Sequence, residues 1–254
     1  NLHLTAEHFG GEQYNGCNDY LVISYPEAVE KVHRSFLEVG VDVLETDTFR
    51  SNRITMAEYK LQDRVIEINE TAARLARRLA DEYSGHGQPQ ELPRLRFVAG
   101  SIGPSGKLPS ANDPELSNVT FDELAETFRE QAVGLIRGGV DLLLIETCQD
   151  LLQTKAALAA SFEVMGRTRA VPVYVSVTIE QTGTMLAGQG VEALAVSLMH
   201  RDLLYLGLNC ATGPAFMTDH VRSLSALART RVACVPNAGL PDEDGCYREG
   251  PADV

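Results

Sequence analysis

The stretch GVDLLLIET, at residues 139–147, decides the fold class of this chain. Glycine opens the stretch, Asp141 interrupts its apolar residues once, a continuous apolar run follows at residues 142–145, and Glu146 and Thr147 close it. A continuous apolar run of this length is typical of a strand that is buried on both faces of a parallel sheet. A shorter copy, GVDVLET, occupies residues 40–46, and a helix is predicted before each copy. Repeated units of strand and helix favour a barrel over an open sheet.

The same alternation continues along the rest of the chain. Apolar runs predict strands at residues 41–46, 96–102, 140–145, 171–179, 203–208 and 231–235. Helical periodicity predicts helices at about residues 56–83, 151–165, 191–199 and 215–227. These strands and helices make about six units, where a complete barrel has eight. We therefore predict an α/β protein, a (β/α)8 TIM barrel truncated at both ends, which occupies residues 1–254 as one partial domain.

Two capping boxes mark the starts of two further helices. Ser24 with Glu27, and Thr120 with Glu123, have the spacing at which the two side chains cap a helix reciprocally. Glycines close these helices, at Gly40 and at residues 138–139, because glycine readily adopts the conformation that ends a helix. The Gly- and Pro-containing residues 84–93 predict a polar loop.

Composition predicts a soluble cytoplasmic protein. Apolar residues make up 44% of the 254 residues and charged residues 22%. No run approaches the roughly 20 apolar residues of a membrane helix, and the N-terminus does not read as a signal peptide. Five scattered cysteines without CxxC spacing indicate reduced thiols. The net charge of −13 disfavours binding to nucleic acid or to anionic membranes, because phosphate would be repelled.

Two further features narrow the interpretation. No GxGxxG follows the first predicted strand, so a dinucleotide-binding fold has no support. The chain begins with Asn rather than Met and ends in the acidic, Gly- and Pro-containing residues 241–254. We therefore expect it to be an excerpt of a longer protein.

Polar residues follow every predicted strand, and we expect them to meet at one face, where barrels place their chemistry. They include Thr46, Ser101, Glu146, Ser176, Cys210 and Asn237. Glu146 follows an apolar run, and a carboxylate there suits a substrate ammonium group. Cys210 could bind a soft metal or attack a substrate as a thiolate, or it could be a small packed residue of the core.

Seven short motifs appear in order along nearly the whole chain, at 16–19, 45–49, 98–104, 145–147, 186–189, 207–211 and 236–241. With these motifs the chain resembles the homocysteine-binding, zinc-dependent methyltransferase domains. Within that family it is most similar to the domain that opens cobalamin-dependent methionine synthases. The sequence NAGLP at residues 237–241 favours this group over the relatives that use betaine or S-methylmethionine. Asp47 departs from the family, which usually has Asn there.

The resemblance implies a function, a metal and a set of roles. The family transfers a methyl group from methylcobalamin, held by another domain, to the thiolate of zinc-bound homocysteine, which becomes methionine. Cys210 would be both the catalytic cysteine and a zinc ligand, with a vicinal cysteine pair beyond residue 254 supplying the other ligands. Glu146 would bind the substrate amino group with Asn237 nearby, and Thr46, Ser101 and Ser176 would line the pocket. The implied partners are homocysteine and the folate- and cobalamin-binding domains of the same parent chain.

The remaining cysteines, Cys17, Cys148, Cys234 and Cys246, fall outside the family's ligand positions and are interpreted as packing or loop residues. Two other functions stay open. One is methyl transfer to homocysteine from S-methylmethionine or betaine. The other is a barrel fragment that has no catalytic activity as the chain stands. Because only one zinc ligand is present, we expect the 254 residues alone to bind zinc weakly and to be inactive.

Overall fold

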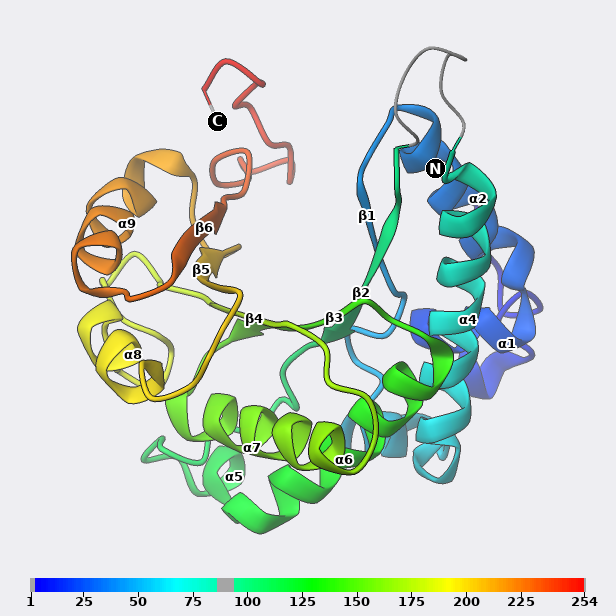
Figure 1. Ribbon diagram of the computed structural model, residues 1–254, viewed down its shortest axis with the longest axis horizontal. Helices are drawn as coiled ribbons and strands as arrows, with labels where there is room; N and C mark the ends of the chain where they lie inside the picture. The colour runs from blue at the N-terminus through cyan, green and yellow to red at the C-terminus, as the bar shows by residue number, and fades with distance from the viewer. Residues whose placement is uncertain (1–2, 86–93, 254) are drawn as a thin grey trace. The chain divides into compact units, whose positions relative to one another are not determined.

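The computed structural model describes residues 3–85 and 94–253 and has an α/β fold in which strands and helices alternate (Figure 1). The strands are β1 (Val43–Glu45), β2 (Phe97–Ile102), β3 (Leu142–Cys148), β4 (Val173–Val177), β5 (Tyr205–Asn209) and β6 (Arg231–Val235). The α-helices are α1 (Leu21–Ser24), α2 (Pro26–Glu38), α3 (Arg53–Met56), α4 (Val65–Tyr83), α5 (Pro114–Ser117), α6 (Phe121–Gly138), α7 (Leu151–Arg167), α8 (Val191–Leu198) and α9 (Pro214–Leu227). The predicted loop at 84–93 lies mostly outside the described residues.

The strands are hydrogen-bonded in the order in which they occur in the sequence, from β1 to β6. The pairs β1–β2, β4–β5 and β5–β6 are parallel, with Leu44 opposite Val98 and Leu208 opposite Cys234. Sequential parallel strands joined by helices are the repeating unit of α/β proteins. The α/β class is therefore confirmed, and the closed eight-stranded barrel stays a prediction.

The chain divides into two compact units, each described by itself. The first unit contains Asn1–Ser105, Glu126–Leu143 and Ala160–Val171, and the second contains Gly106–Ala125, Leu144–Ala159 and Pro172–Val254. Each unit has fully buried apolar side chains of its own. They include Met56, Ile68, Leu79, Phe128 and Leu135 in the first unit, and Ile145, Ile179, Met185 and Leu194 in the second. Among the described residues, no helix is both long and apolar enough to cross a membrane.

The sequence repeat corresponds to a repeated helix ending in the first unit. After α2, the Gly40 N–H donates to the Leu37 carbonyl at 3.0 Å and the next N–H donates back to Phe36 at 3.3 Å. After α6, Gly139 and the residue that follows it make the same two bonds. Both glycines have φ near +90°, at 92° and 95°, which glycine adopts without steric cost. The two copies therefore turn from helix to strand in the same way.

The aspartate of the second copy secures the start of β3. The Asp141 carboxylate accepts from the Val98 N–H at 2.7 Å and from the Arg77 guanidinium at 2.5 Å. The Asp141 N–H in turn donates to the Val98 carbonyl at 2.8 Å. This aspartate thus ties the start of one strand to the neighbouring backbone, which explains its place in the motif.

The structure corrects two local predictions and confirms a third. Ser24 does not cap α2, because its hydroxyl donates to the Tyr20 carbonyl at 3.3 Å and α2 begins at Pro26 without a side-chain cap. The helix predicted from residue 56 is interrupted, because Lys60 adopts a left-handed conformation with φ of 58° and α4 begins only at Val65. The box of Thr120 and Glu123 is confirmed, with bonds of 2.8 and 3.2 Å between backbone N–H groups and the two side chains.

The expectation of strands buried on both faces holds for the inner strands and fails at the two ends of the strand order. β2, β4 and β5 are largely buried, whereas Val43 of β1 is 46% exposed and Val235 of β6 is 59% exposed. β1 is also shorter than the predicted strand at 41–46. In the described residues β1 and β6 each pair with a single strand, which leaves one side of each without a strand neighbour.

Candidate active site

The predicted site residues fall into two groups, one in each compact unit. Glu146, Ser176, Cys210 and Asn237 belong to the second unit, and Thr46 and Ser101 belong to the first. All six lie at or just beyond the carboxyl ends of strands. Parallel strands carry functional groups at this end in α/β proteins, so each group is a candidate part of an active site.

In the second unit, a pair of hydrogen bonds joins the ends of β3 and β5. The Thr147 N–H donates to Asn209 Oδ1 at 3.1 Å, and Asn209 Nδ2 donates to Thr147 Oγ1 at 2.8 Å. Thr147 follows Glu146 directly and Asn209 precedes Cys210 directly. The structure therefore connects the two residues with the strongest predicted roles through their immediate neighbours.

The backbone at these strand ends adopts a conformation that is rare for residues other than glycine. Thr147 has φ of 56°, and Cys210 and Ala211 both have φ of 59°. A β-branched residue with positive φ is a true outlier, and each such residue costs about 1–3 kcal/mol. Residues of this kind cluster at functional sites, where the surrounding hydrogen bonds hold them. This observation supports a functional role for both strand ends.

Backbone hydrogen bonds bring Asn237 to the same edge of the second unit as Cys210. The Cys210 N–H donates to the Val235 carbonyl at 3.0 Å, and the Thr212 N–H donates to the Cys210 carbonyl at 2.7 Å. The Asn237 N–H donates to the Thr212 carbonyl at 3.1 Å. The side chain of Cys210 is exposed and Asn237 is partly exposed, so a small molecule can reach both.

The end of β4 and the residue that follows it carry two buried hydroxyl groups without hydrogen-bond partners in the described part of the chain. Ser176 is 1% exposed and Thr178 is 2% exposed, and neither hydroxyl oxygen has a hydrogen-bond partner among the described residues. A buried polar atom without a partner costs about 1–3 kcal/mol, so such atoms in a strand end call for an explanation. A polar ligand at this edge would satisfy them, in agreement with the proposed place of Ser176 in the pocket wall.

In the first unit, Thr46 and Ser101 are joined by a buried network. The Ser101 N–H donates to Thr46 Oγ1 at 3.0 Å, the hydroxyls of Thr46 and Thr48 are 2.7 Å apart, and Thr48 Oγ1 donates to the Ser101 carbonyl at 2.8 Å. The hydroxyl of Thr46 therefore already has two partners within the protein. Its contacts connect β1 to β2 and shape the wall of a groove of about 510 Å³, which Asn18, Glu45 and Asp47 also line.

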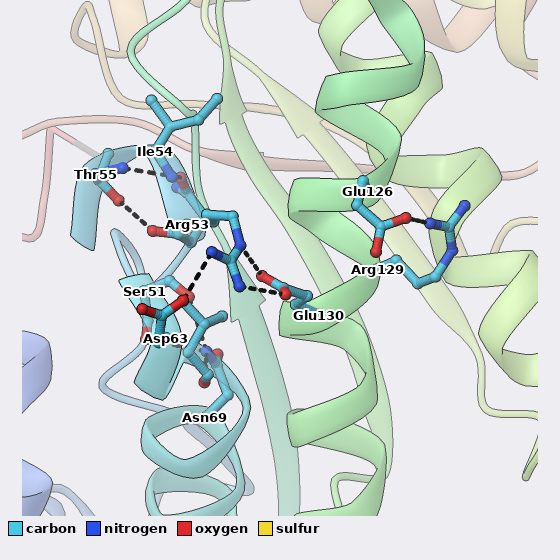
Figure 2. Close-up of polar contacts among 11 residues, drawn as sticks. Ser51, Arg53, Ile54, Thr55, Asp63, Asn69, Glu126, Arg129 and Glu130 are labelled. Carbon is cyan, nitrogen blue, oxygen red and sulfur yellow. Dashed lines mark hydrogen bonds and ion pairs between the residues drawn. The ribbon is translucent and has the colours of Figure 1, made fainter. Parts of the chain in front are cut away.

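The segment that follows Thr48 is anchored by side chains from helices of the same unit. Asn69 of α4 donates to the Ser51 carbonyl at 2.8 Å, and Asn52 caps α3 by accepting from two backbone N–H groups. Figure 2 shows Arg53 of α3 between Asp63 and Glu130, where it forms two bonds of 2.8 Å with the Glu130 carboxylate. These contacts hold residues 51–53, which directly follow the segment that carries Thr46 and Thr48.

Two acidic residues next to this segment have shifted pKa values. Burial raises the pKa of Asp19 to about 6, against the opposing effect of the Arg50 N–H, which donates to Asp19 Oδ1 at 2.9 Å. Burial raises the pKa of Asp47 to about 7, and the charge of Asp19 adds to this shift. Burial also raises the pKa of the Cys17 thiol to about 12, which makes it a poor nucleophile at neutral pH.

The other cysteines occupy different surroundings. Cys17 and Cys148 are buried, and burial raises the pKa of Cys148 to about 12. Cys234 lies on β6 with its sulfur 3.4 Å from that of Met217, and Cys246 is exposed in a loop. The buried pair fits the predicted packing role and Cys246 fits the loop role, whereas Cys234 is an exposed strand residue.

The described residues supply part of a zinc site and do not complete one. A catalytic zinc site uses three protein ligands and an open position. Cys210 offers one exposed thiol at the strand edge, and in residues 3–85 and 94–253 no group of three or more His, Cys, Asp and Glu side chains could hold a metal ion. Cys210 can therefore contribute to a zinc site only together with ligands from elsewhere.

Sequence reasoning pointed to the strand ends but missed the pairing of Thr147 with Asn209. Both residues adjoin a predicted site residue, and this adjacency is the one signal the sequence offers. It does not show that the two side chains meet, because they are 62 positions apart.

Comparison with known proteins places the chain in a family. The profile of the family described as homocysteine S-methyltransferase matches residues 2–254. Methionine synthase of Mycobacterium tuberculosis (strain ATCC 25618 / H37Rv) is 41% identical over 239 residues, which cover 94% of this chain. Methionine synthase of Mycobacterium leprae (strain TN) is 40% identical over the same length and share of the chain. The match spans only 19% of the length of each of these relatives.

Among the solved structures with a similar fold are those of a homocysteine methyltransferase. The metallated form of MmuM from Escherichia coli has a TM-score of 0.71 and 20% sequence identity, over 86% of this chain and 75% of that one. The oxidized form has a TM-score of 0.72 and 21% identity, over 87% and 74%. At this identity the likeness establishes the fold, and the profile match over residues 2–254 establishes the family. The chain belongs to the homocysteine S-methyltransferase family.

Proposed function

We propose that this chain is the homocysteine-binding domain of a methionine synthase, in which the homocysteine sulfur takes a methyl group from methylcobalamin to give methionine. The observation that supports this proposal most is the pair of hydrogen bonds between Thr147 and Asn209, which connects the ends of β3 and β5. It brings a carboxylate and an exposed thiol to connected strand ends of one compact unit. Family membership and the methionine synthase relatives favour the same reaction.

Each residue of the second unit has a proposed role. Glu146 is partly exposed and accepts a hydrogen bond from the substrate ammonium group, whose positive charge it balances. Asn237 is proposed to bind the substrate near Glu146, and the buried hydroxyl of Ser176 is proposed to bind a polar substrate atom that would satisfy it. In the first unit, Thr46 and Ser101 are proposed substrate-binding residues, held in place by the hydrogen bond between them.

Cys210 is proposed to be one of the zinc ligands, with the others supplied from outside the described residues. A zinc ion with a complete ligand set favours the thiolate form of a coordinated thiol at neutral pH. The folate- and cobalamin-binding domains of the parent protein are the proposed partners, and the cytoplasm is the proposed location. The 254 residues alone are proposed to bind zinc weakly and to lack activity.

The test uses the full-length protein that contains this chain, purified with zinc. Methyl transfer to homocysteine is measured with methylcobalamin, S-methylmethionine or betaine as the only donor. We expect turnover with methylcobalamin alone. Turnover with only one of the other two donors would contradict the methionine synthase assignment and leave the family intact.

The role of Cys210 is tested with Cys210→Ala, and Cys246→Ala serves as a control because Cys246 is an exposed loop cysteine. We expect Cys210→Ala to lose both zinc and methyl transfer, because one thiolate ligand is gone. The control should keep both. Retention of zinc and most of the rate by Cys210→Ala would show that Cys210 is not a ligand.

A further inference from the structure

We infer that Thr147 and Asn209 act as a positioning pair that sets Glu146 and Cys210 relative to each other for homocysteine binding. The inference rests on the proposed function, since it concerns the same two strand ends. Neither member of the pair needs to touch the substrate. Their role would be to hold in place Glu146 and Cys210, which are the residues proposed to act on the substrate.

The pair is built to define one geometry. Asn209 accepts from the Thr147 N–H through Oδ1 and donates to the Thr147 hydroxyl through Nδ2, at 3.1 and 2.8 Å. Both ends of the amide are engaged by one residue, so rotation of the amide would break both bonds. A single residue is thus held by two bonds of different direction, which restricts its backbone and its side chain together.

The pair connects two strands that are not neighbours. In the strand order β4 lies between β3 and β5, so backbone ladder bonds link the latter two strands only through β4. The bonds between Thr147 and Asn209 link them directly at the end where Glu146 and Cys210 lie. A shift of either strand end would therefore be resisted by this pair.

The backbone conformation at these positions depends on such support. Thr147 and Cys210 have φ of 56° and 59°, where residues other than glycine are strained. The side-chain amide of Asn209 accepts a hydrogen bond from the backbone N–H of Thr147, and Asn209 directly precedes Cys210. Without the pair, the backbone of Thr147 would be free to relax toward extended backbone, which would redirect the adjoining Glu146 side chain.

Binding of homocysteine should be sensitive to a change in the relative position of Glu146 and Cys210. Its ammonium group and its thiol stand at a separation limited by a short carbon chain, so a protein that contacts both must place its own groups to match. A thiol without the amino group, such as 4-mercaptobutanoate, has no ammonium group for Glu146 to bind. Loss of the positioning pair should therefore weaken the binding of homocysteine more than the binding of this analogue.

The experiment measures the dissociation constants of homocysteine and 4-mercaptobutanoate by calorimetry, using the zinc-loaded full-length protein. Asn209→Ala removes both bonds of the pair, Thr147→Val removes only the bond to the hydroxyl, and Thr147→Ser keeps the hydroxyl. Thr230→Val is the matched control, because the Thr230 hydroxyl donates to the Leu203 carbonyl at 2.7 Å beside the opposite ends of β5 and β6.

We expect Asn209→Ala and Thr147→Val to raise the dissociation constant of homocysteine about tenfold, the effect of roughly one hydrogen bond. Thr147→Ser and Thr230→Val should keep the dissociation constant of homocysteine within about twofold of wild type. No variant should change binding of 4-mercaptobutanoate by more than about twofold, because this analogue does not contact Glu146 and so does not depend on the relative position of the two strand ends. In a Glu146→Gln background, Asn209→Ala should have little further effect on homocysteine binding, since the ammonium contact that depends on the pair is already lost.

Three outcomes would overturn the inference and leave the proposed function standing. They are equally weakened binding of both thiols, effects of Asn209→Ala and Glu146→Gln on homocysteine binding that add fully, and unchanged homocysteine binding by Asn209→Ala. If wild type itself does not bind homocysteine, the proposed function fails and the inference fails with it. Should Asn209→Ala not fold, the contrast between Thr147→Val and Thr147→Ser decides the question alone.

Discussion

The side-chain amide of Gln131 donates to the backbone carbonyl of Thr48 at 2.7 Å, and this bond connects the segment after β1 to helix α6. The same nitrogen lies 3.2 Å from the Ser101 carbonyl oxygen, and Gln131 is fully buried. One side chain therefore holds both backbone segments that carry Thr46 and Ser101.

Gln131→Leu should destabilise the protein by about 2 kcal/mol, because it removes the donor from the buried Thr48 carbonyl. The measurement is the free energy of unfolding in urea. Gln181→Leu, at an exposed position, is the control and should change stability by less than about 0.5 kcal/mol. Equal values for the two variants would show that the Gln131 bond does not stabilise the fold.

Glu130→Gln tests the second anchor of the same segment. The two bonds from Arg53 to Glu130 join α3 to α6, and the Glu130 side chain is only 18% exposed. We expect a loss of about 1 kcal/mol in unfolding free energy, more than the exposed pairs of a single helix contribute. Glu67→Gln, which breaks a similar fork with Arg64 at 54% exposure, should cost clearly less. The reverse ranking would contradict this interpretation.

Asp47→Asn should stabilise the protein in a pH-dependent manner. The pKa of Asp47 rises from 3.8 to about 7 on folding, because burial and then the charge of Asp19 disfavour the carboxylate. Between pH 4 and 7 the folded state therefore binds more protons than the unfolded state, and stability falls as pH rises. Removing the ionisable group should raise the unfolding free energy by about 1–3 kcal/mol at pH 8 and by little at pH 4.

The control for this effect is Asp42→Asn, because Arg94 and Arg96 lower the pKa of Asp42. Its carboxylate stabilises the folded state above the ordinary pKa, so its removal should lower stability at neutral pH. Urea unfolding at several pH values measures both variants. A pH-independent effect of Asp47→Asn would show that its carboxyl group has an ordinary pKa.

Glu146→Gln tests the proposed ammonium contact separately from metal binding. The substitution keeps the shape and removes the charge, and a hydrogen bond to a charged group contributes roughly 1.5–3 kcal/mol. Homocysteine affinity of the full-length protein should fall about ten- to a hundredfold, and zinc content should not change. A thiol that lacks the amino group should bind almost as before. Equal losses for both thiols would assign Glu146 to the fold instead.

Much of the fold follows from local patterns in the sequence. The apolar runs locate β2, β3, β4, β5 and β6 to within a few residues, because strands that are buried must be apolar. The glycines at 40 and 139 end helices as predicted, since each adopts a positive φ that few other residues tolerate. The box of Thr120 with Glu123 is confirmed because both partners lie within one turn of chain.

Other features depend on contacts that no local pattern contains. Ser24 has the same spacing to Glu27 as Thr120 has to Glu123, yet its hydroxyl bonds to Tyr20 of the preceding turn. The exposure of Val43 follows from the place of β1 at one end of the strand order, a property of the sheet rather than of the strand.

The sequence by itself determined which residues stand at strand ends, and it named Glu146 and Cys210 among them. Only the tertiary structure decided that their neighbours Thr147 and Asn209 bond to each other across 62 positions, at strained backbone on both sides. Periodicity records how each side chain is buried locally. Which distant polar groups meet depends on how strands are ordered and aligned, and that is settled by the packing of the whole unit.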